Sequence, residues 1–321
     1  MKLNKVLITG GAGYIGSVIT RKLLQDHKVT VLDNLMYNQI PLIDLCGNPQ
    51  FKFIYGDVRD YKLLIEQVQK HDVIIPLAAL VGFPACENDK QLANQVNFLH
   101  IKDIVDNLTG EQMLLFPNTN SGYGSRAQGV VDETNKLTPI SCYGQTKCDA
   151  ENYIKSFSKG IIFRLATVFG VSSRMRLDLL VNEFVYKLLT DKYITIFEKK
   201  FIRNFIHIQD VASVFEFMID NYDKHQTYIF NVGLSDTNIN KQQLVERIQN
   251  HIPNTSVTYS DYFVDPDKRD YVVSNEKIES TGWKPHYDLD HGIKELIQAY
   301  QMIVPHESSR YRNAFPLGYG V

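Results

Sequence analysis

A glycine-rich turn between an apolar run and a periodic segment constrains this chain more than any other feature. Residues 6–9 are β-branched and aliphatic, and residues 14–24 repeat apolar side chains at helical spacing. This order predicts a strand, a tight turn and a helix. Gly10, Gly13 and Gly16 allow a sharp turn, close approach to a pyrophosphate and packing of the helix on the sheet. Because a helix N-terminus also favours phosphate, we expect a dinucleotide site here.

A carboxylate indicates which dinucleotide binds. The next predicted strand, residues 28–32, ends at Asp33. A carboxylate in this position can accept hydrogen bonds from the adenosine ribose hydroxyls and would repel a 2′-phosphate. The other interpretation of Asp33 is an acid that starts a turn, but the upstream glycines favour ribose binding. We therefore expect NAD as the cofactor.

Strand and helix patterns alternate up to residue 170, which predicts an α/β fold with a doubly wound parallel sheet. Ligands of such sheets lie beyond the carboxyl ends of the strands, where the pattern places Asp33, Asp57, Ala78 and Thr119. After residue 170 the alternation stops. We expect residues 1–170 to form the cofactor-binding domain, with about 205–232 returning to it. Residues 171–321 should form mainly a smaller, partly discontinuous substrate-binding lid.

Composition limits the other classes of function. The chain of 321 residues has 34 basic and 36 acidic residues, so its charge gives no reason to expect nucleic acid. It contains no apolar run of transmembrane length, and its first residues lead straight into a strand. The four cysteines lack zinc-like spacing, so we expect reduced thiols and no metal. These features favour a cytoplasmic protein without a membrane partner.

Tyr143 and Lys147 are four residues apart at the start of a predicted helix and therefore share one face. A free tyrosine has a pKa of roughly 10, and a neighbouring cation together with a nicotinamide ring would stabilise its phenolate. Thr119 lies at a neighbouring strand end, where its hydroxyl can orient a substrate alcohol. Such a set removes an alcohol proton while a hydride passes to NAD⁺. Chance Tyr–Lys pairs are common on helix surfaces, and only the dinucleotide turn upstream makes this pair informative.

Motifs spread over nearly the whole chain resemble the extended short-chain dehydrogenase/reductases that act on nucleotide sugars. They are the glycine turn at 9–16, Asp57-Val58, Leu77-Ala78-Ala79, Asn97, Tyr143-x-x-x-Lys147, and the segments 203–212 and 281–285. The resemblance implies a Rossmann-type fold, NAD, a nucleotide-sugar substrate, and a homodimer formed through helices near 91–108 and 141–158.

The resemblance also implies roles for individual residues. The catalytic set would be Thr119, Tyr143 and Lys147. The cofactor site would comprise Gly10, Gly13, Tyr14, Ile15, Gly16, Asp33, Asn34, Asp57, Val58, Leu77, Ala78, Ala79, Asn97, Tyr143 and Lys147. The substrate site would comprise Phe83, Asn120, Ser121, Arg174, Asn182, Arg203 and Arg269. Among these, Asn182, Arg203 and Arg269 would hold the diphosphate of the sugar nucleotide.

For several of the predicted substrate residues, a purely structural or surface role is also possible. Arg203 and Arg269 could be solvated surface charges, and Asn182 a helix-surface amide. Arg174 could pair with an acidic neighbour, and Phe83 could belong to the core.

One departure from the family pattern bears on the reaction. Relatives that eliminate water place Asp or Glu directly after the Ser/Thr, whereas this chain has Asn120 and Ser121. Elimination is therefore disfavoured, which leaves oxidation at one ring carbon, C4, by a 4-dehydrogenase or a 4-epimerase. Segments 33–37 and 174–176 resemble bacterial surface-polysaccharide enzymes acting on GDP-linked heptoses, so a GDP-linked hexose or heptose is the expected substrate. The alternatives are a 4,6-dehydratase and an NAD-sensing protein without catalysis.

Overall fold

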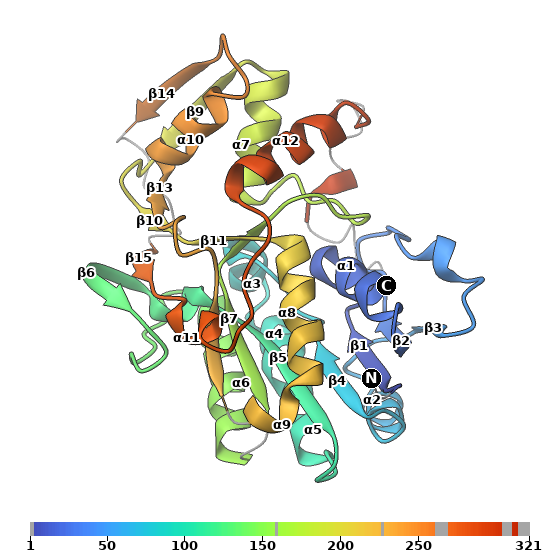
Figure 1. The fold of residues 1–321 in the computed structure, drawn as a ribbon. Helices are drawn as coiled ribbons and strands as arrows, with labels where there is room; N and C mark the ends of the chain where they lie inside the picture. Colours follow the sequence, from blue (N-terminus) through green and yellow to red (C-terminus); the bar gives the residue numbers. More distant parts are fainter. Residues whose placement is uncertain (1–2, 158–159, 226–227, 261–268, 304–309, 314–321) are drawn as a thin grey trace.

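Seven parallel strands form one sheet in the order β12-β7-β5-β4-β1-β2-β3 (Figure 1). The computed structural model describes residues 3–157, 160–225, 228–260, 269–303 and 310–313, without the side chains of 83, 126–128 and 157. The strands are β1 (Lys5–Thr9), β2 (Lys28–Asp33), β3 (Phe51–Tyr55), β4 (Val73–Pro76), β5 (Met113–Thr119), β7 (Ile161–Leu165) and β12 (Ile229–Val232). The strand order reverses between β1 and β4, so the carboxyl ends of these two strands flank the switch point at which such sheets bind ligands. The expected doubly wound sheet is confirmed.

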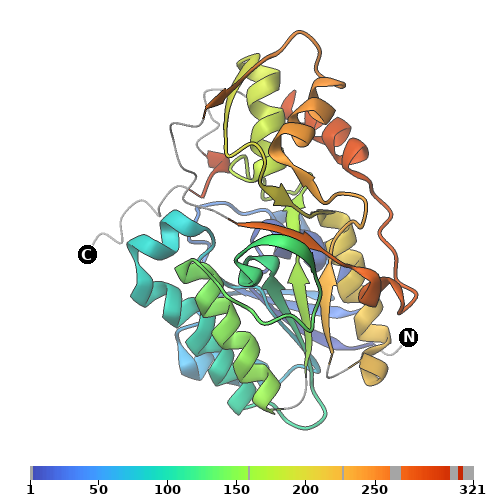
Figure 2. The ribbon, with the colours of Figure 1, turned by 90° about the vertical axis from the view of Figure 1, so that its left-hand side faces the viewer.

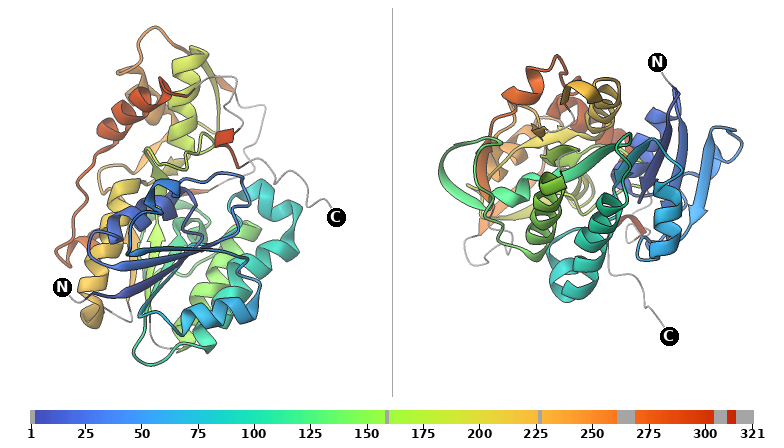
Figure 3. Two further views of the ribbon diagram at one scale, coloured as in Figure 1. Left: turned by 90° about the vertical axis from the view of Figure 1, so that its right-hand side faces the viewer. Right: turned by 90° about the horizontal axis from the view of Figure 1, so that it is seen from below.

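Helices cover both faces of this sheet (Figure 3). On one face, α1 (Tyr14–Leu23) and α8 (Ile208–Asp220) pack on the apolar side chains of the strands. On the other face lie α2 (Tyr61–Val68), α5 (His100–Asp106) and α6 (Cys142–Phe157). The helix expected near 91–108 consists of α4 (Lys90–Asn94), a π-helical stretch at Gln95–Leu99, and α5.

A second lobe lies beyond the carboxyl ends of the strands (Figures 1 and 2). Its helices are α7 (Leu180–Thr190), α10 (Lys241–Gln249) and α12 (Leu289–Tyr300). Its strand pairs are β9 (Tyr193–Phe197) with β14 (Ser256–Ser260), and β10 (Ile202–Arg203) with β13 (Ile239–Asn240). Side chains fix the helix starts: Asp288 caps α12, and Asn240 with Gln243 forms a capping box on α10.

The remaining elements are short. Two further parallel pairs are β8 (Thr167–Phe169) with β11 (Phe205–His207), and β6 (Ser125–Val131) with β15 (Asp270–Val273), the latter visible in Figure 2. The remaining helices are η1 (Ile43–Leu45), α3 (Phe83–Asn88), η3 (Asn120–Tyr123), α9 (Tyr222–His225) and α11 (Glu276–Glu279). Strands β6 and β15 and helix α3 were not predicted. The pairing of β6 with β15 joins residues far apart in the sequence, so a local pattern of apolar residues cannot predict it.

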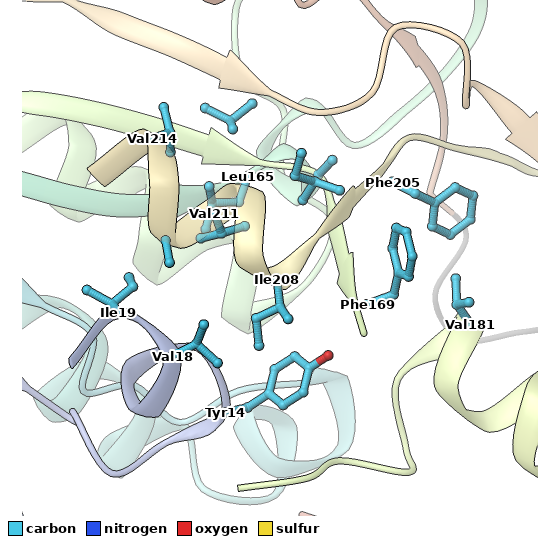
Figure 4. Close-up of a cluster of buried hydrophobic side chains, with 14 of the residues drawn as sticks. Tyr14, Val18, Ile19, Leu165, Phe169, Val181, Phe205, Ile208, Val211 and Val214 are labelled. Carbon is cyan, nitrogen blue, oxygen red and sulfur yellow. The ribbon is translucent and has the colours of Figure 1, made fainter. Parts of the chain in front are cut away.

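Buried side chains of α1, α8 and the second lobe form one continuous apolar cluster (Figure 4). Tyr14 is the first residue of α1 in this cluster, and its hydroxyl donates a 2.7 Å hydrogen bond to the carbonyl of Gly170. The helix that begins at the glycine turn is thereby joined directly to the segment that leads into the second lobe.

Candidate active site

The glycine turn has the geometry that the sequence predicted for a phosphate site. Gly10 has a φ of +70°, and a Cβ there would lie 2.5 Å from the backbone nitrogen of Ala78. A Cβ on Gly16 would lie 2.4 Å from the carbonyl oxygen of Gly10, so both positions require glycine. Gly13 is the N-cap of α1, and no side chain caps the helix there. The first turn of α1 is therefore suited to bind phosphate oxygens.

One cleft brings most of the predicted cofactor residues together with the predicted catalytic pair. Tyr143 and Lys147 line the same cleft as the glycine turn. The other predicted residues that line it are Gly10, Gly13, Tyr14, Ile15, Gly16, Asp33, Asn34, Asp57, Val58, Leu77, Ala78, Ala79 and Arg174. The cleft lies where the switch-point rule placed it, beyond β1 and β4.

Two carboxylates mark one end of the cleft. Asp33 accepts hydrogen bonds from the backbone N–H groups of Ala12 (2.9 Å) and Leu35 (2.8 Å). Burial raises the pKa of Asp33, and these bonds oppose that rise. Asp57 is bonded to the guanidinium of Arg59 at 2.8 Å and to the amide of Asn34 at 3.2 Å. Burial of Asp57 is outweighed by its bonds to Arg59, so the pKa of Asp57 is lowered.

Two predicted cofactor residues have their side chains committed to the protein. The hydroxyl of Tyr14 bonds to Gly170, so the side chain of Tyr14 belongs to the core. Asn97 is buried; its amide oxygen accepts from the N–H of Leu80 at 2.8 Å, and its amide nitrogen donates to Thr146 at 3.2 Å. The structure therefore corrects the expectation for Asn97, whose side chain ties the segment after β4 to α6 and does not line the cleft.

The predicted catalytic pair lies in the first two turns of α6. Burial raises the pKa of Tyr143 to about 12, although the charges of Arg269 and Arg176 oppose this rise. Burial also lowers the pKa of Lys147 to about 7, and the Lys147 ammonium lies 4.1 Å from the centroid of the Phe116 ring. For the side chains alone, burial is the larger effect on both groups. The expectation that Lys147 and a nicotinamide ring together stabilise the phenolate of Tyr143 stays a prediction.

Thr119 ends β5 and connects to the predicted substrate residues. Its hydroxyl lies 2.9 Å from that of Ser121, and the guanidinium of Arg269 donates to Ser121. Thr119, Ser121 and Arg269 thus form one polar group. The guanidinium carbon of Arg203 lies 6.0 Å from the centroid of the Tyr271 ring, and Tyr271 follows Arg269 by two residues.

Asn120 and Phe83 complete the predicted sugar site. The amide atoms of Asn120 are buried and have no hydrogen-bond partner among the described residues. The backbone of Phe83 opens α3, and its side chain lies outside the described part of the chain.

Asn182 has a different role from the one expected. It is 0% exposed, its amide oxygen accepts from the N–H of Gly170 at 3.2 Å, and its amide nitrogen donates to the carbonyl of Arg176 at 2.9 Å. We predicted that Asn182 would hold a diphosphate. Because its amide is buried and bonded to backbone, it shapes the segment between these two residues instead.

Sequence reasoning missed a buried ionic network beneath Thr119. Glu151 accepts two hydrogen bonds from Arg164, at 2.6 and 3.1 Å, and one from the amide of Asn118 at 2.5 Å. Asn118 in turn accepts the backbone N–H of Thr119 at 2.8 Å, and Arg164 donates to the hydroxyl of Tyr123 at 2.8 Å. Two signals could have revealed it: Glu151 follows Lys147 by four residues on one helix face, and Arg164 interrupts an apolar strand.

The described residues show neither a metal site nor a membrane-spanning helix. These residues contain no group of three or more His, Cys, Asp or Glu side chains placed to hold a metal ion. None of their helices combines the length and the apolar character needed to span a bilayer.

The chain is similar to known nucleotide-sugar enzymes. A protein of Methanocaldococcus jannaschii named "Putative UDP-glucose 4-epimerase" is 29% identical over 309 residues, which cover 91% of this chain and 97% of that protein. The dTDP-D-glucose 4,6-dehydratase of Mus musculus is 26% identical over 325 residues, covering 92% and 88%. The structure of UDP-N-acetylglucosamine 4-epimerase from Methanobrevibacter ruminantium matches with a TM-score of 0.84 at 22% identity, covering 95% and 100%.

The family assignment rests on the match to a family model. The model of the NAD dependent epimerase/dehydratase family matches residues 6–233, which include the glycine turn, Thr119, Tyr143 and Lys147. This chain therefore belongs to that family and is an NAD-dependent enzyme of the nucleotide-sugar epimerase/dehydratase class.

Proposed function

We propose that this enzyme oxidises C4 of a nucleotide-activated sugar to a 4-keto sugar. The observation that carries the proposal is that Tyr143 and Lys147 line the same cleft as the glycine turn, with Thr119 at the end of the adjoining strand β5. That arrangement suits alcohol oxidation by NAD, which accepts a hydride from the sugar carbon.

Each residue of the site has a separate role in the proposed reaction. Tyr143 removes the proton of the C4 hydroxyl, and the Thr119 hydroxyl holds the oxygen in place. Lys147 holds the ribose next to the nicotinamide and adds positive charge near the phenol. Arg203 and Arg269 bind the diphosphate of the substrate, because a planar guanidinium matches phosphate oxygens with two parallel hydrogen bonds. Asn120 and Ser121 contact the sugar.

A 4,6-dehydratase is the second candidate, since several similar proteins carry that name. Water elimination needs ionisable groups that move protons at C5 and C6. Asn120 and Ser121 occupy the positions after Thr119 and cannot ionise usefully. The lack of an acid at these two positions favours C4 oxidation over elimination.

The fate of the keto sugar separates two enzymes. If hydride returns to the opposite face, the enzyme is a 4-epimerase; if the keto sugar leaves, it is a 4-dehydrogenase. We propose GDP-linked hexoses and heptoses as the first substrates to test, because segments 33–37 and 174–176 resemble enzymes of bacterial surface polysaccharides that act on them.

Purified protein incubated with NAD⁺ and a panel of GDP-, UDP-, CDP- and dTDP-sugars tests the proposal. NADH with an equal amount of keto sugar indicates a dehydrogenase, and an epimer without net NADH indicates an epimerase. Exchange of solvent hydrogen into C5 indicates a dehydratase. If the panel yields neither a keto sugar with NADH nor an epimer, the proposal is contradicted.

Tyr143→Phe tests the role of the base. It removes a single oxygen, so turnover should fall by at least about 100-fold while NAD⁺ still binds. Tyr61→Phe, on the exposed face of α2, is the matched control and should keep full activity. Retained activity in Tyr143→Phe would remove Tyr143 from the mechanism.

We also propose a homodimer formed through α4–α5 and α6, helices that resemble the dimer contact of this family. Leu99 is partly exposed in the first of these segments, and the ring centroids of Phe98 and Tyr153 of α6 lie 6.1 Å apart. Light scattering at micromolar concentration should give twice the chain mass, and a monomer mass would contradict the proposal.

A further inference from the structure

Arg174 enters the cofactor cleft from the segment that leads into the second lobe. The hydroxyl of Ser172, two residues earlier, donates to the carbonyl of Tyr14 at 2.8 Å and lies 2.9 Å from the hydroxyl of Ser17. The backbone N–H of Arg174 donates to the same Ser172 hydroxyl at 3.2 Å. The segment is therefore fixed on the first turn of α1, the turn suited to bind phosphate.

The side chain of Arg174 is buried and incompletely satisfied. It is 2% exposed, and its guanidinium carbon lies 4.5 Å from the centroid of the Tyr37 ring. Its Nη2 atom has no hydrogen-bond partner within the described part of the chain. Arg176, by contrast, makes two hydrogen bonds to Asp178, at 2.7 and 3.1 Å. A buried guanidinium with an unused N–H is costly, so the position calls for an anionic acceptor.

The position of Arg174 distinguishes between two possible anions. Arg174 lines the cleft together with Gly10, Gly13 and Asp33, and its positive charge opposes the burial-driven rise of the Asp33 pKa. Arg203 and Arg269 do not line that cleft; they lie with Ser121 and Tyr271 beside Thr119. The arginines therefore form two separate groups. In a complex of the protein with NAD and a sugar nucleotide, we expect one group at the diphosphate of each ligand.

We propose that Arg174 binds the pyrophosphate of NAD, and not the sugar nucleotide to which the sequence assigned it. Tyr37 supports the guanidinium from one side, and the first turn of α1 supplies N–H groups from the other. The second lobe then contributes directly to the cofactor site. This inference requires only that the chain binds NAD, and it does not depend on C4 oxidation.

Isothermal titration of the full chain with four ligands tests the assignment. In Arg174→Gln, affinity for NAD⁺ and for ADP-ribose should fall together by about 10- to 100-fold, the range expected for a lost charge-assisted bond. Affinity for GDP and for UDP should stay unchanged. Arg247→Gln is the control, because it removes an arginine of the second lobe that pairs with Asp290 far from the cleft.

Two results would overturn the proposal: unchanged NAD⁺ affinity in a folded variant, or a loss confined to GDP or UDP. If thermal melting shows that Arg174→Gln does not fold, Arg174→Lys carries the test. Lysine keeps the charge but loses the planar fork, so NAD⁺ and ADP-ribose should bind roughly 10-fold more weakly. Wild-type affinity for both ligands in Arg174→Lys would refute the assignment. None of these readouts depends on turnover, so they stand apart from the test of the reaction.

Discussion

Glu151→Gln should destabilise this protein more than almost any other single isosteric change. The side chains of Glu151 and Arg164 are 0% and 2% exposed, and two hydrogen bonds join them. Burial disfavours the charge on Arg164, but the bonds to Glu151 outweigh burial and raise the pKa of Arg164 above its ordinary value. A guanidinium is not deprotonated at neutral pH, so Arg164 stays charged when its partner is removed. A neutral glutamine keeps the shape but leaves a buried, uncompensated cation.

The expected cost follows from that uncompensated charge. Breaking a buried ion pair on one side costs about 3–5 kcal/mol. The double variant Glu151→Leu/Arg164→Met removes both charges, so it should cost less than the sum of the two single changes. Asn118 also loses a charged acceptor in Glu151→Gln, and Asn118 holds the backbone N–H of Thr119. We therefore expect kcat to fall as well, with NAD⁺ affinity unchanged.

Urea unfolding at pH 7 with linear extrapolation measures these free energies. Glu66→Gln is the matched control, because Glu66 forms an exposed ion pair with Lys70 on α2, and its urea midpoint should match that of the wild type. A cost below about 1 kcal/mol for Glu151→Gln would refute the reasoning. Additive single and double variants would refute the coupling between the two charges.

Three further changes test other parts of the structure. Gly16→Ala should abolish NAD⁺ binding, because its Cβ would lie 2.4 Å from the Gly10 carbonyl, whereas Gly47→Ala has no atom within 4 Å and should bind normally in the same titration. Burial lowers the pKa of His100 from 6.5 to about 3, so the unfolded chain binds more protons between these values and stability falls as pH drops through them. The free energy of unfolding of the wild type should fall by about 2 kcal/mol between pH 8 and pH 5 through this group. In urea unfolding, the fall for His100→Leu should be smaller by that amount. Equal falls for the two proteins would contradict the lowered pKa of His100. Lys147→Met should move the inflection of the pH–rate profile to higher pH and lower the rate at pH 7. The control Lys155→Met, at the exposed end of α6, should change neither quantity. Identical profiles for the wild type and Lys147→Met would exclude an electrostatic role for Lys147.

The order of elements and the cofactor turn could be predicted because local patterns encode them. The turn between β1 and α1 requires glycine for steric reasons, and the glycines can be recognised in the sequence between a strand pattern and a helix pattern. The positions of Asp33, Tyr143 and Lys147 follow from their places at strand and helix ends. Parallel pairing then brings them to one edge of the sheet without further information.

The roles of the buried amides could not be predicted in this way. Asn97 and Asn182 are polar residues in helical segments, and nothing in their neighbourhoods shows whether they face ligand or backbone. Their partners, Leu80 and Gly170, lie 17 and 12 residues away in the sequence, in loops whose paths depend on the whole fold. Arg164 meets Glu151 only after α6 packs on the sheet. Tertiary contacts therefore decided these three positions.

Burial of Tyr143 bears on both half-reactions of the proposed chemistry. With a pKa of about 12, only about one Tyr143 in 10⁵ is ionised at pH 7, so the phenol by itself is a poor base. The positive nicotinamide ring of NAD⁺ would add to the charges of Arg176 and Arg269 and favour the phenolate when a proton must be removed. The ring of NADH would be neutral and would not add this charge, so burial would again favour the protonated form of Tyr143. A protonated phenol is what reduction of a 4-keto sugar requires, because the new alkoxide must receive a proton. Burial thus favours the protonated phenol with which the second half-reaction of an epimerase would begin.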